Sequence, residues 1–128
     1  MYHKDLEAWK KSIDLVAEIY ELTKNFPEDE KFGIVNQMRR AAISIPSNIA
    51  EGTARGSDKE AIRFLDISIG SLAELETQII ISEKLKYITD TTIYEQINST
   101  AALISGLKNT WSINLKTLSH LITQSLSH

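Results

Sequence analysis

The sequence predicts an all-α protein, folded as one antiparallel up-down-up-down four-helix bundle over residues 1–128. Apolar residues recur at steps of three and four along four long segments, which is the spacing of amphipathic helices. The links between these segments are short, and short links join antiparallel neighbours. No strand signal competes, since the chain has neither sustained period-two alternation nor an Asn-Gly hairpin dipeptide. A length of 128 residues is typical of a single domain.

The first helix is expected from about Asp5 to Asn25. Pro27 ends it, because the residue before a proline is pushed out of the α region. Two rows of apolar residues follow this helix, and together they make a surface broader than one packing partner would cover. The main row is Leu6, Trp9, Ile13, Val16 and Tyr20, and the second row is Leu15, Ile19, Leu22 and Phe26.

The second helix is expected to begin near Glu28 or Asp29, where acidic residues suit a helix N-terminus, and to end near Ala54. Pro46 lies inside it, and an internal proline removes one hydrogen bond at a cost of about 3 kcal/mol. Either the helix stops near Ser44 and restarts, or it runs through with a kink. We favour a kink at Pro46, because the apolar row keeps its register across the proline. That row is Ile34, Met38, Ala41, Ala42, Ile45 and Ile49.

A polar stripe runs beside the apolar row of the second helix at the same helical steps. At about 100° per residue it lies roughly a third of a turn away, so it flanks the apolar row and does not oppose it. A flanking stripe is well placed to meet a neighbouring helix or subunit. We interpret it as a network between subunits, with a solvent face and an active site as the alternatives. The stripe consists of Gln37, Arg40, Ser44, Asn48, Glu51 and Arg55.

The third helix is expected to run from a capping box at Ser57 and Glu60 to about Tyr87. The fourth is expected to run from a second such box at Thr92 and Glu95 to near the C-terminus. Gly70-Ser71 in the third helix lowers its propensity and allows another backbone to approach closely. The apolar rows are Ile62, Leu65, Ile69, Leu72, Ile79 and Ile80 in the third helix, and Ile93, Ile97, Ala101, Ile104, Trp111, Leu115, Leu118 and Ile122 in the fourth.

The composition excludes several classes of site and protein. The chain has no cysteine, which rules out disulfides, thiolate metal sites and cysteine nucleophiles and fits a reducing cytoplasm. The net charge is −3 and the sequence pI is about 5.6, whereas nucleic-acid binders normally carry a basic surplus. Residues 36–63 are locally basic, with five Lys or Arg against three Asp or Glu. The charged start and the shortness of every apolar run argue against a signal peptide and a membrane span.

No cofactor, metal or enzymatic site is expected. His3, His120 and His128 lack ligand spacing, no Glu-x-x-His pair marks a di-metal bundle, and no phosphate loop is present. Glu74 and Glu76 are two residues apart, so on a helix they point away from each other and cannot share a proton. A basic patch has two interpretations, salt-bridged structure, which we favour, and contact with nucleic-acid phosphates. It consists of Arg39, Arg40, Arg55, Lys59 and Arg63.

The chain resembles the bacterial four-helix-bundle family called 23S rRNA-intervening-sequence proteins. The most specific resemblance lies in Gln37-x-x-Arg40-Ala-Ala-x-Ser44-Ile-Pro-x-Asn48-Ile-Ala-Glu51-Gly52. It extends over nearly the whole chain, through Leu6-x-x-Trp9, Phe26-Pro27 and Gly70-Ser71-x-x-Glu74-Leu-Glu76. The family name records where some of the genes lie, inside insertions in ribosomal RNA genes, and not an activity.

This resemblance implies a left-handed antiparallel bundle that assembles as a barrel-like homopentamer. A related branch, the accessory variability proteins of diversity-generating retroelements, binds nucleic acid and a reverse transcriptase. Those relatives are strongly basic, whereas this chain is acidic.

We therefore expect a non-enzymatic, cytoplasmic, self-assembling protein, with five subunits implied by the resemblance. The broad apolar surface of the first helix motivates the oligomer, together with Ile43 on the far side of the second helix from its apolar row. The alternative is an accessory protein that contacts RNA or DNA through the basic patch. The expected interface or polar network consists of Arg40, Ser44, Asn48, Glu51, Arg55, Glu74 and Glu76.

Overall fold

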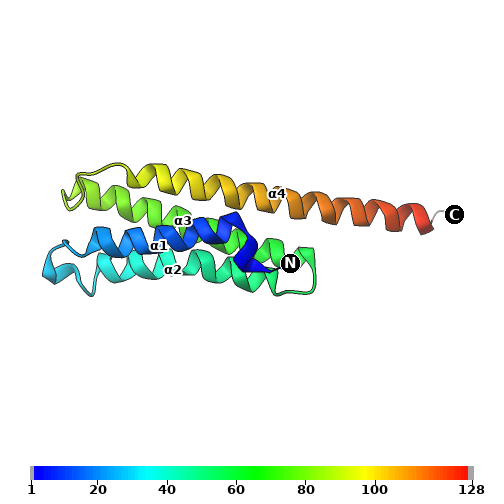
Figure 1. The fold of residues 1–128 in the computed structure, drawn as a ribbon, viewed down its shortest axis with the longest axis horizontal. Coiled ribbons are helices and arrows are strands. Elements are labelled where there is room, and N and C mark those ends of the chain that lie inside the picture. The colour runs from blue at the N-terminus through cyan, green and yellow to red at the C-terminus, as the bar shows by residue number, and fades with distance from the viewer. Residues whose placement is uncertain (1, 127–128) are drawn as a thin grey trace.

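The computed structural model describes residues 2–126, and this part of the chain is helical with no strand. Four long helices follow one another, α1 (Glu7–Thr23), α2 (Ile34–Thr53), α3 (Asp58–Lys84) and α4 (Ile93–Leu126). Short 3-10 helices precede α1 at His3–Asp5 and α2 at Glu28–Glu30. Each helix packs against the next and runs back along it, and α4 also packs against α1 (Figure 1). The predicted antiparallel four-helix bundle is confirmed.

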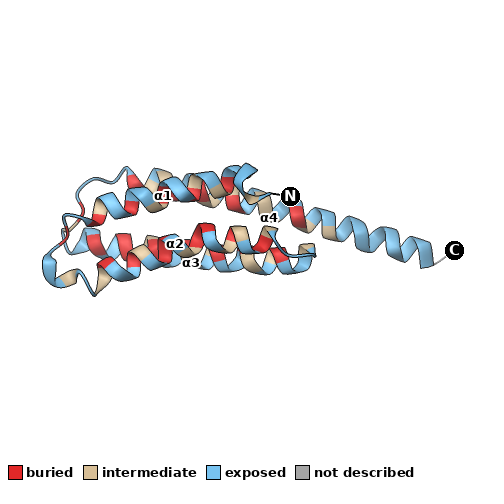
Figure 2. Ribbon diagram, turned by 60° about the horizontal axis from the view of Figure 1, so that its bottom comes forward, coloured by how far each residue is buried: buried red, intermediate tan, exposed pale blue. Residues whose placement is uncertain are grey.

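The core takes one row of side chains from each helix. In α1 the second apolar row faces the core, whereas Ile13 and Tyr20 of the main row are exposed. The expectation that the apolar surface of α1 is broader than one packing partner would cover is therefore confirmed. Buried and exposed residues alternate along α1, α2, α3 and the part of α4 up to Trp111 (Figure 2). The largest fully buried apolar side chains are Leu15, Ile19, Met38, Ile45, Ile49, Leu65, Leu75, Ile79, Ile97 and Ile104.

The predicted start of the second helix at residue 28 was wrong, because α2 begins at Ile34. Residues Glu28–Glu30 form a 3-10 turn instead, in which the Lys31 amide donates to the carbonyl of Glu28 at 3.2 Å. Gly33 follows with φ −103° and ψ −117°, outside the helical region, so the helix starts only after it.

The α2 helix runs without a break from Ile34 to Thr53, with Pro46 inside it. Of the two alternatives, the continuous helix is thus the correct one. The apolar row keeps its register across the proline, since Met38, Ala42 and Ile45 before it and Ile49 after it are all buried. A buried row on both sides of Pro46 lets packing offset the hydrogen bond that the proline removes. The size of the bend at Pro46 stays a prediction.

Gly52, and not Gly70 as the sequence suggested, is the glycine at which α2 and α3 approach closely. A Cβ atom at Gly52 would lie 3.0 Å from the carbonyl oxygen of Ala61 and 3.1 Å from Cβ of Phe64. A Cβ atom at Gly70 would meet nothing within 4 Å. The absence of a side chain at Gly52 therefore permits the tight packing of the α2 end against the start of α3.

The last part of α4 extends beyond the other three helices. This helix has 34 residues, hence a length of about 51 Å at 1.5 Å per residue. Its buried residues end at Trp111, and the segment 112–126 projects past the end of the bundle (Figures 1 and 2). Leu118 and Ile122 have the predicted helical spacing, but no neighbouring helix covers them within the described residues, and they are 55% and 52% exposed. We call residues 112–126 the α4 overhang.

Candidate assembly surfaces

The middle of the polar stripe is bonded within the subunit, at the junction of α2 and α3. The hydroxyl groups of Ser44 and Ser71 lie 2.8 Å apart. Asn48 donates from Nδ2 to the carbonyl oxygen of Ser44 at 2.8 Å and to its Oγ at 3.0 Å. Both Ser44 and Asn48 are half-buried. Ser44 therefore joins α2 to α3, and Asn48 holds Ser44 from within α2.

A polar hollow of about 330 Å³ opens beside this network, between Gln37 and Arg40 of α2 and Ser71 and Glu74 of α3. Arg40 is exposed, and among the described residues it makes no ion pair within 4 Å. The Glu74 carboxylate accepts a hydrogen bond from Nε2 of Gln78 at 3.3 Å. This hollow presents a cation and an anion side by side to whatever approaches the α2–α3 face.

Gln78 is buried behind Glu74, and its Oε1 atom lacks a hydrogen-bond partner among the described residues. A buried polar atom without a hydrogen-bond partner lowers the stability of the fold. This side of α3 therefore leaves one hydrogen bond unmade within the subunit. Glu76 contributes to the negative field that raises the pKa of Tyr94 on α4. It thus lies on the α4 side of α3, away from Glu74, as the two-residue spacing predicts.

The C-terminal end of the stripe is an ion pair on the surface. Arg55 Nη2 lies 2.7 Å from Glu51 Oε1, with side chains that are 44% and 54% exposed. An exposed helical pair of this spacing contributes about 0.3–0.5 kcal/mol. The Arg55 guanidinium also lies 4.7 Å from the centre of the Phe64 ring. This end of the stripe is satisfied within the subunit.

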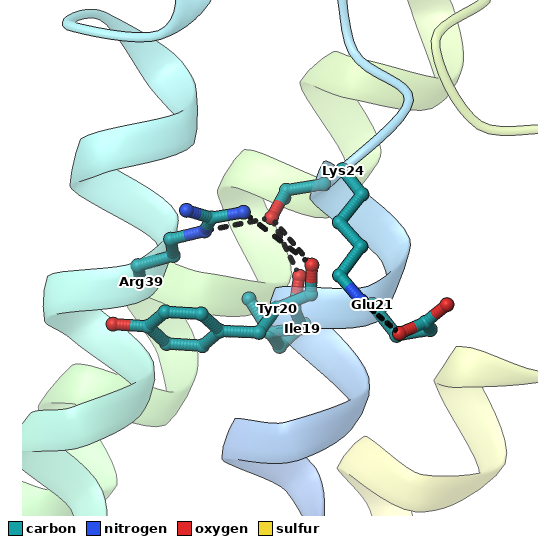
Figure 3. Close-up of polar contacts among 6 residues, drawn as sticks. Ile19, Tyr20, Glu21, Lys24 and Arg39 are labelled. Atoms are coloured by element: carbon teal, nitrogen blue, oxygen red, sulfur yellow. Dashed lines mark hydrogen bonds and ion pairs between the residues drawn. The ribbon is translucent and has the colours of Figure 1, made fainter.

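The predicted basic patch does not form one surface. Arg39 faces α1, where its Nε donates to the Thr23 hydroxyl at 3.0 Å and its Nη2 to the Tyr20 carbonyl at 3.4 Å (Figure 3). Its guanidinium also lies over the Tyr20 ring, 4.5 Å from the ring centre. Arg40 lies on the other side of α2, in the polar hollow. Neither arginine joins the cations at the α2–α3 turn.

The remaining basic residues gather at the α2–α3 turn, where acidic partners offset them. Arg63 pairs with Glu60 at 3.0 Å, as Arg55 does with Glu51, and both guanidinium groups flank the Phe64 ring. The salt-bridged interpretation is therefore correct for two of the three cations. Lys59 lines a second hollow beside Trp111 and makes no ion pair among the described residues.

Apolar side chains gather on the outer face where α1 meets α2. Ile13 and Tyr20 of α1 are 41% and 37% exposed, and Ile43 of α2 is 42% exposed. The two helices are antiparallel and Arg39 lies over the Tyr20 ring, so one turn past Arg39 corresponds to one turn before Tyr20, and we infer from this register that Ile43 lies on the Val16 side. We call Ile13, Val16, Tyr20 and Ile43 the α1–α2 apolar patch. The sequence placed the first three in one row of α1 and Ile43 apart on α2, and only the packing of α1 on α2 relates them.

The titratable residues of the described part do not form a metal site, since no group of three or more His, Asp or Glu is arranged to hold an ion. His3 packs against the Trp9 ring at 5.3 Å, and His120 lies on the α4 overhang. His128 lies outside the described residues. No helix in residues 2–126 combines the length and the apolar character that crossing a bilayer requires.

The sequence was also compared with known protein families. The sequence model of the 23S rRNA-intervening sequence protein family matches residues 4–109. This chain belongs to that family. The match ends just before Trp111, so it contains the bundle, the polar stripe and the α1–α2 apolar patch but not the α4 overhang.

A solved structure supports the same fold. It is a protein of unknown function from the S23 ribosomal protein family of Bacteroides thetaiotaomicron, 24% identical in sequence, with a TM-score of 0.73. The alignment covers 80% of this chain and 95% of that protein. No functionally curated protein matches the sequence.

Proposed function

We propose that this family member is a non-enzymatic scaffold protein that assembles through the sides of its bundle. The observation that carries the proposal is the α1–α2 apolar patch, because contiguous apolar side chains on a surface mark interaction sites. The patch is ordered by Arg39, which holds the two helices together at its edge. A rigid apolar surface of this kind fits a permanent interface better than a transient one.

The polar hollow supplies orientation to the same assembly. Arg40 offers five donors in a planar fork, and Glu74 offers acceptors beside it. A neighbouring subunit that inserts complementary groups there would be held in one register, since charges at interfaces select geometry more than they add affinity. The family resemblance suggests a ring of five copies, and the cysteine-free composition fits a cytoplasmic location.

A variant pair tests this proposal. Replacing both Ile13 and Ile43 with Asp places two charges in the patch, and we expect the assembly to fall to smaller species. Replacing Ser99 and Ser105 of α4 with Asp adds the same charge on exposed positions of the helix diagonal to α2. Sedimentation velocity should show dissociation of the first variant alone, with unchanged helix content by circular dichroism in both. Equal sedimentation of the two variants and the parent would refute the proposal.

The second candidate function is contact with RNA or DNA at the α2–α3 turn. Its support is Lys59, together with the two guanidinium groups on the Phe64 ring. Filter binding across a salt series tests it, because phosphate contacts weaken steeply as salt rises. Binding at low salt that Lys59→Glu abolishes would favour this function over the scaffold, and no binding at low salt would end it.

A further inference from the structure

The apolar seam of α4 does not stop where the bundle stops. Inside the bundle the core side of α4 carries Ile97, Ile104 and Trp111, which are buried. In steps of four, three and four, the same side continues from Trp111 through Leu115 and Leu118 to Ile122. At 100° per residue these four lie within about 80° of one another, which is the narrow seam of a helix that packs on another helix.

The overhang needs a covering partner to remain helical. Most positions away from the seam are Ser, Thr or Asn, which favour helices less than Ala, Glu or Lys do, and the others are Ile113, Lys116, His120 and Gln124. A helical end of about 15 residues is marginal in water without packing on its apolar side. Leu118 and Ile122 are both more than half exposed, so the subunit itself does not supply that packing.

The charges of the overhang favour a second copy over a different protein. Residues 112–126 contain no Asp or Glu and one Lys, Lys116. Lys116 lies more than a quarter turn from the seam, so two seams can meet without bringing like charges together. The positions that flank the seam, where charges would select a different partner, are occupied by Ser112, Asn114, Ser119, Leu121 and Leu126.

The direction of pairing follows from the position of the seam. The seam lies on the side of α4 that faces the bundle axis, so a helix laid along it occupies the space directly beyond α1, α2 and α3 (Figure 1). If that helix ran parallel to α4, its own upstream part would pass through the α2–α3 turn. An antiparallel helix approaches from the opposite direction and meets the bundle with its tip.

The hollow that Lys59 and Trp111 line lies at the base of the overhang and has a volume of about 410 Å³. Trp111, Leu115 and Leu118 line it from α4, and Gly52 and Ala61 line it from the end of the bundle. The tip of a second overhang, with Ile122 and Leu126, would reach this hollow after an overlap of about 22 Å, at 1.5 Å per residue. The hollow thus has the position that such a tip requires and an apolar wall on α4, while Arg55, Asp58 and Lys59 line its opposite rim.

We propose that two copies of this chain join end to end through an antiparallel pairing of their α4 overhangs. In antiparallel packing the alternate seam positions face one another, so Leu118 of one copy packs against Ile122 of the other, and the tip of each overhang meets the Leu115 end of its partner. The interface is a two-fold one, because each copy uses the same surface.

This pairing is a small interface. Of the six Leu and Ile side chains in each overhang, the five other than Ile113 lie on or beside the seam and bury roughly 300–600 Å² on each copy, below the roughly 800 Å² of a standard interface. The pairing is therefore concentration-dependent, and it tightens when side-by-side assembly holds several overhangs together. The end-to-end pairing does not require the side-by-side assembly, since its residues lie outside the α1–α2 apolar patch and the polar hollow.

Light scattering on the full-length protein tests the pairing. The double variant Leu118→Asp with Ile122→Asp charges the seam, and we expect half the parent's molar mass at equal concentration. The matched control, Thr117→Asp with Thr123→Asp, adds the same charge on exposed positions outside the seam and should keep the parent's mass. Equal mass for the parent and the seam variant would overturn the proposal. Loss of the Ile13 and Ile43 patch changes the number of side-by-side copies instead, so the two failures are distinguishable.

Disulfide trapping tests the direction of the pairing. The chain has no native cysteine, so only the introduced cysteines can crosslink. A mixture of Leu118→Cys and Ile122→Cys copies should form a crosslinked pair on oxidation, whereas Leu115→Cys copies alone should not. Efficient crosslinking of Leu115→Cys to itself would indicate parallel helices and overturn the antiparallel pairing. Flotation with phosphatidylcholine vesicles addresses a lipid partner. A membrane surface, and not a second copy, covers the overhang under one combination of results. In that case the parent floats with the vesicles, the seam variant does not, and the two proteins have the same molar mass.

Discussion

At the residue scale, Gly52 sets how closely α2 and α3 pack. Gly52→Ala would place a methyl group 3.0 Å from a backbone oxygen and 3.1 Å from Cβ of Phe64, so one helix must shift. We expect the free energy of unfolding to fall by about 1–3 kcal/mol. Gly70→Ala is the matched control, because its methyl group meets nothing within 4 Å, and we expect a gain of about 0.5–1 kcal/mol. Urea unfolding measures both, and equal shifts would contradict this account of Gly52.

Tyr94 gives the bundle a specific dependence on alkaline pH. Its hydroxyl donates to Glu83 Oε2 at 2.7 Å, and this hydrogen bond is the main cause that raises the pKa of Tyr94 to about 12 from 10.0. The folded protein therefore holds this proton more tightly than the unfolded chain does. The stabilisation is fully present below pH 10 and is lost as pH rises from 10 towards 12.

Tyr94→Phe isolates this contribution. We expect the parent to be more stable than the variant at pH 9, and the difference in free energy of unfolding to shrink as pH approaches 12. Denaturant unfolding at matched pH values measures it, because the other titrating groups are common to both proteins. A difference that stays constant over this range would show that the Glu83 contact contributes nothing.

At the element scale, two helix starts with the same sequence signature differ in structure. The Ser57 hydroxyl accepts from the Glu60 amide at 3.3 Å, as the capping box predicts. Near Thr92 the carboxylate of Asp90 accepts the Thr92 amide instead, at 2.9 Å, and these hydrogen bonds lower the pKa of Asp90. A spacing of Ser or Thr with Glu cannot reveal a competing acceptor two residues upstream.

Alanine substitutions should separate these two starts. Ser57→Ala removes a bonded cap and should lower the free energy of unfolding by about 0.5–2 kcal/mol. Thr92→Ala leaves the Asp90 contact in place and should change it much less. Thermal unfolding followed by circular dichroism compares them, and a larger loss at Thr92 than at Ser57 would contradict this assignment of caps.

Helical periodicity predicted the existence of all four helices but not all of their ends or faces. The acidic run at 28–30 suits a helix start, yet its three residues form a 3-10 turn and Gly33 delays α2. Both apolar rows of α1 have helical spacing, so periodicity alone did not reveal that Leu15 faces the core while Ile13 faces out. Which row is buried depends on where α2 and α4 lie, and that information comes only from the fold.

At the scale of the whole molecule, the sequence predicted the composition of the candidate surfaces better than their positions. The polar stripe forms as predicted, but its middle is bonded within the subunit. Asn48 bonds to Ser44, and Ser44 bonds to Ser71 of α3, which is 27 residues further along the sequence. The basic patch divides because Arg39 points toward α1 and Arg40 toward α3. Helical periodicity predicts the α4 overhang as part of the bundle, since periodicity does not show where the other helices end.

The central claim is that the bundle assembles through the α1–α2 apolar patch. The most direct measurement is the molar mass of the seam variant Leu118→Asp with Ile122→Asp, which cannot pair end to end, by multi-angle light scattering at micromolar concentration. The account predicts a discrete multiple of the 14.4 kDa chain, and a ring of five would give five chain masses. A single-chain mass throughout that concentration range would contradict it.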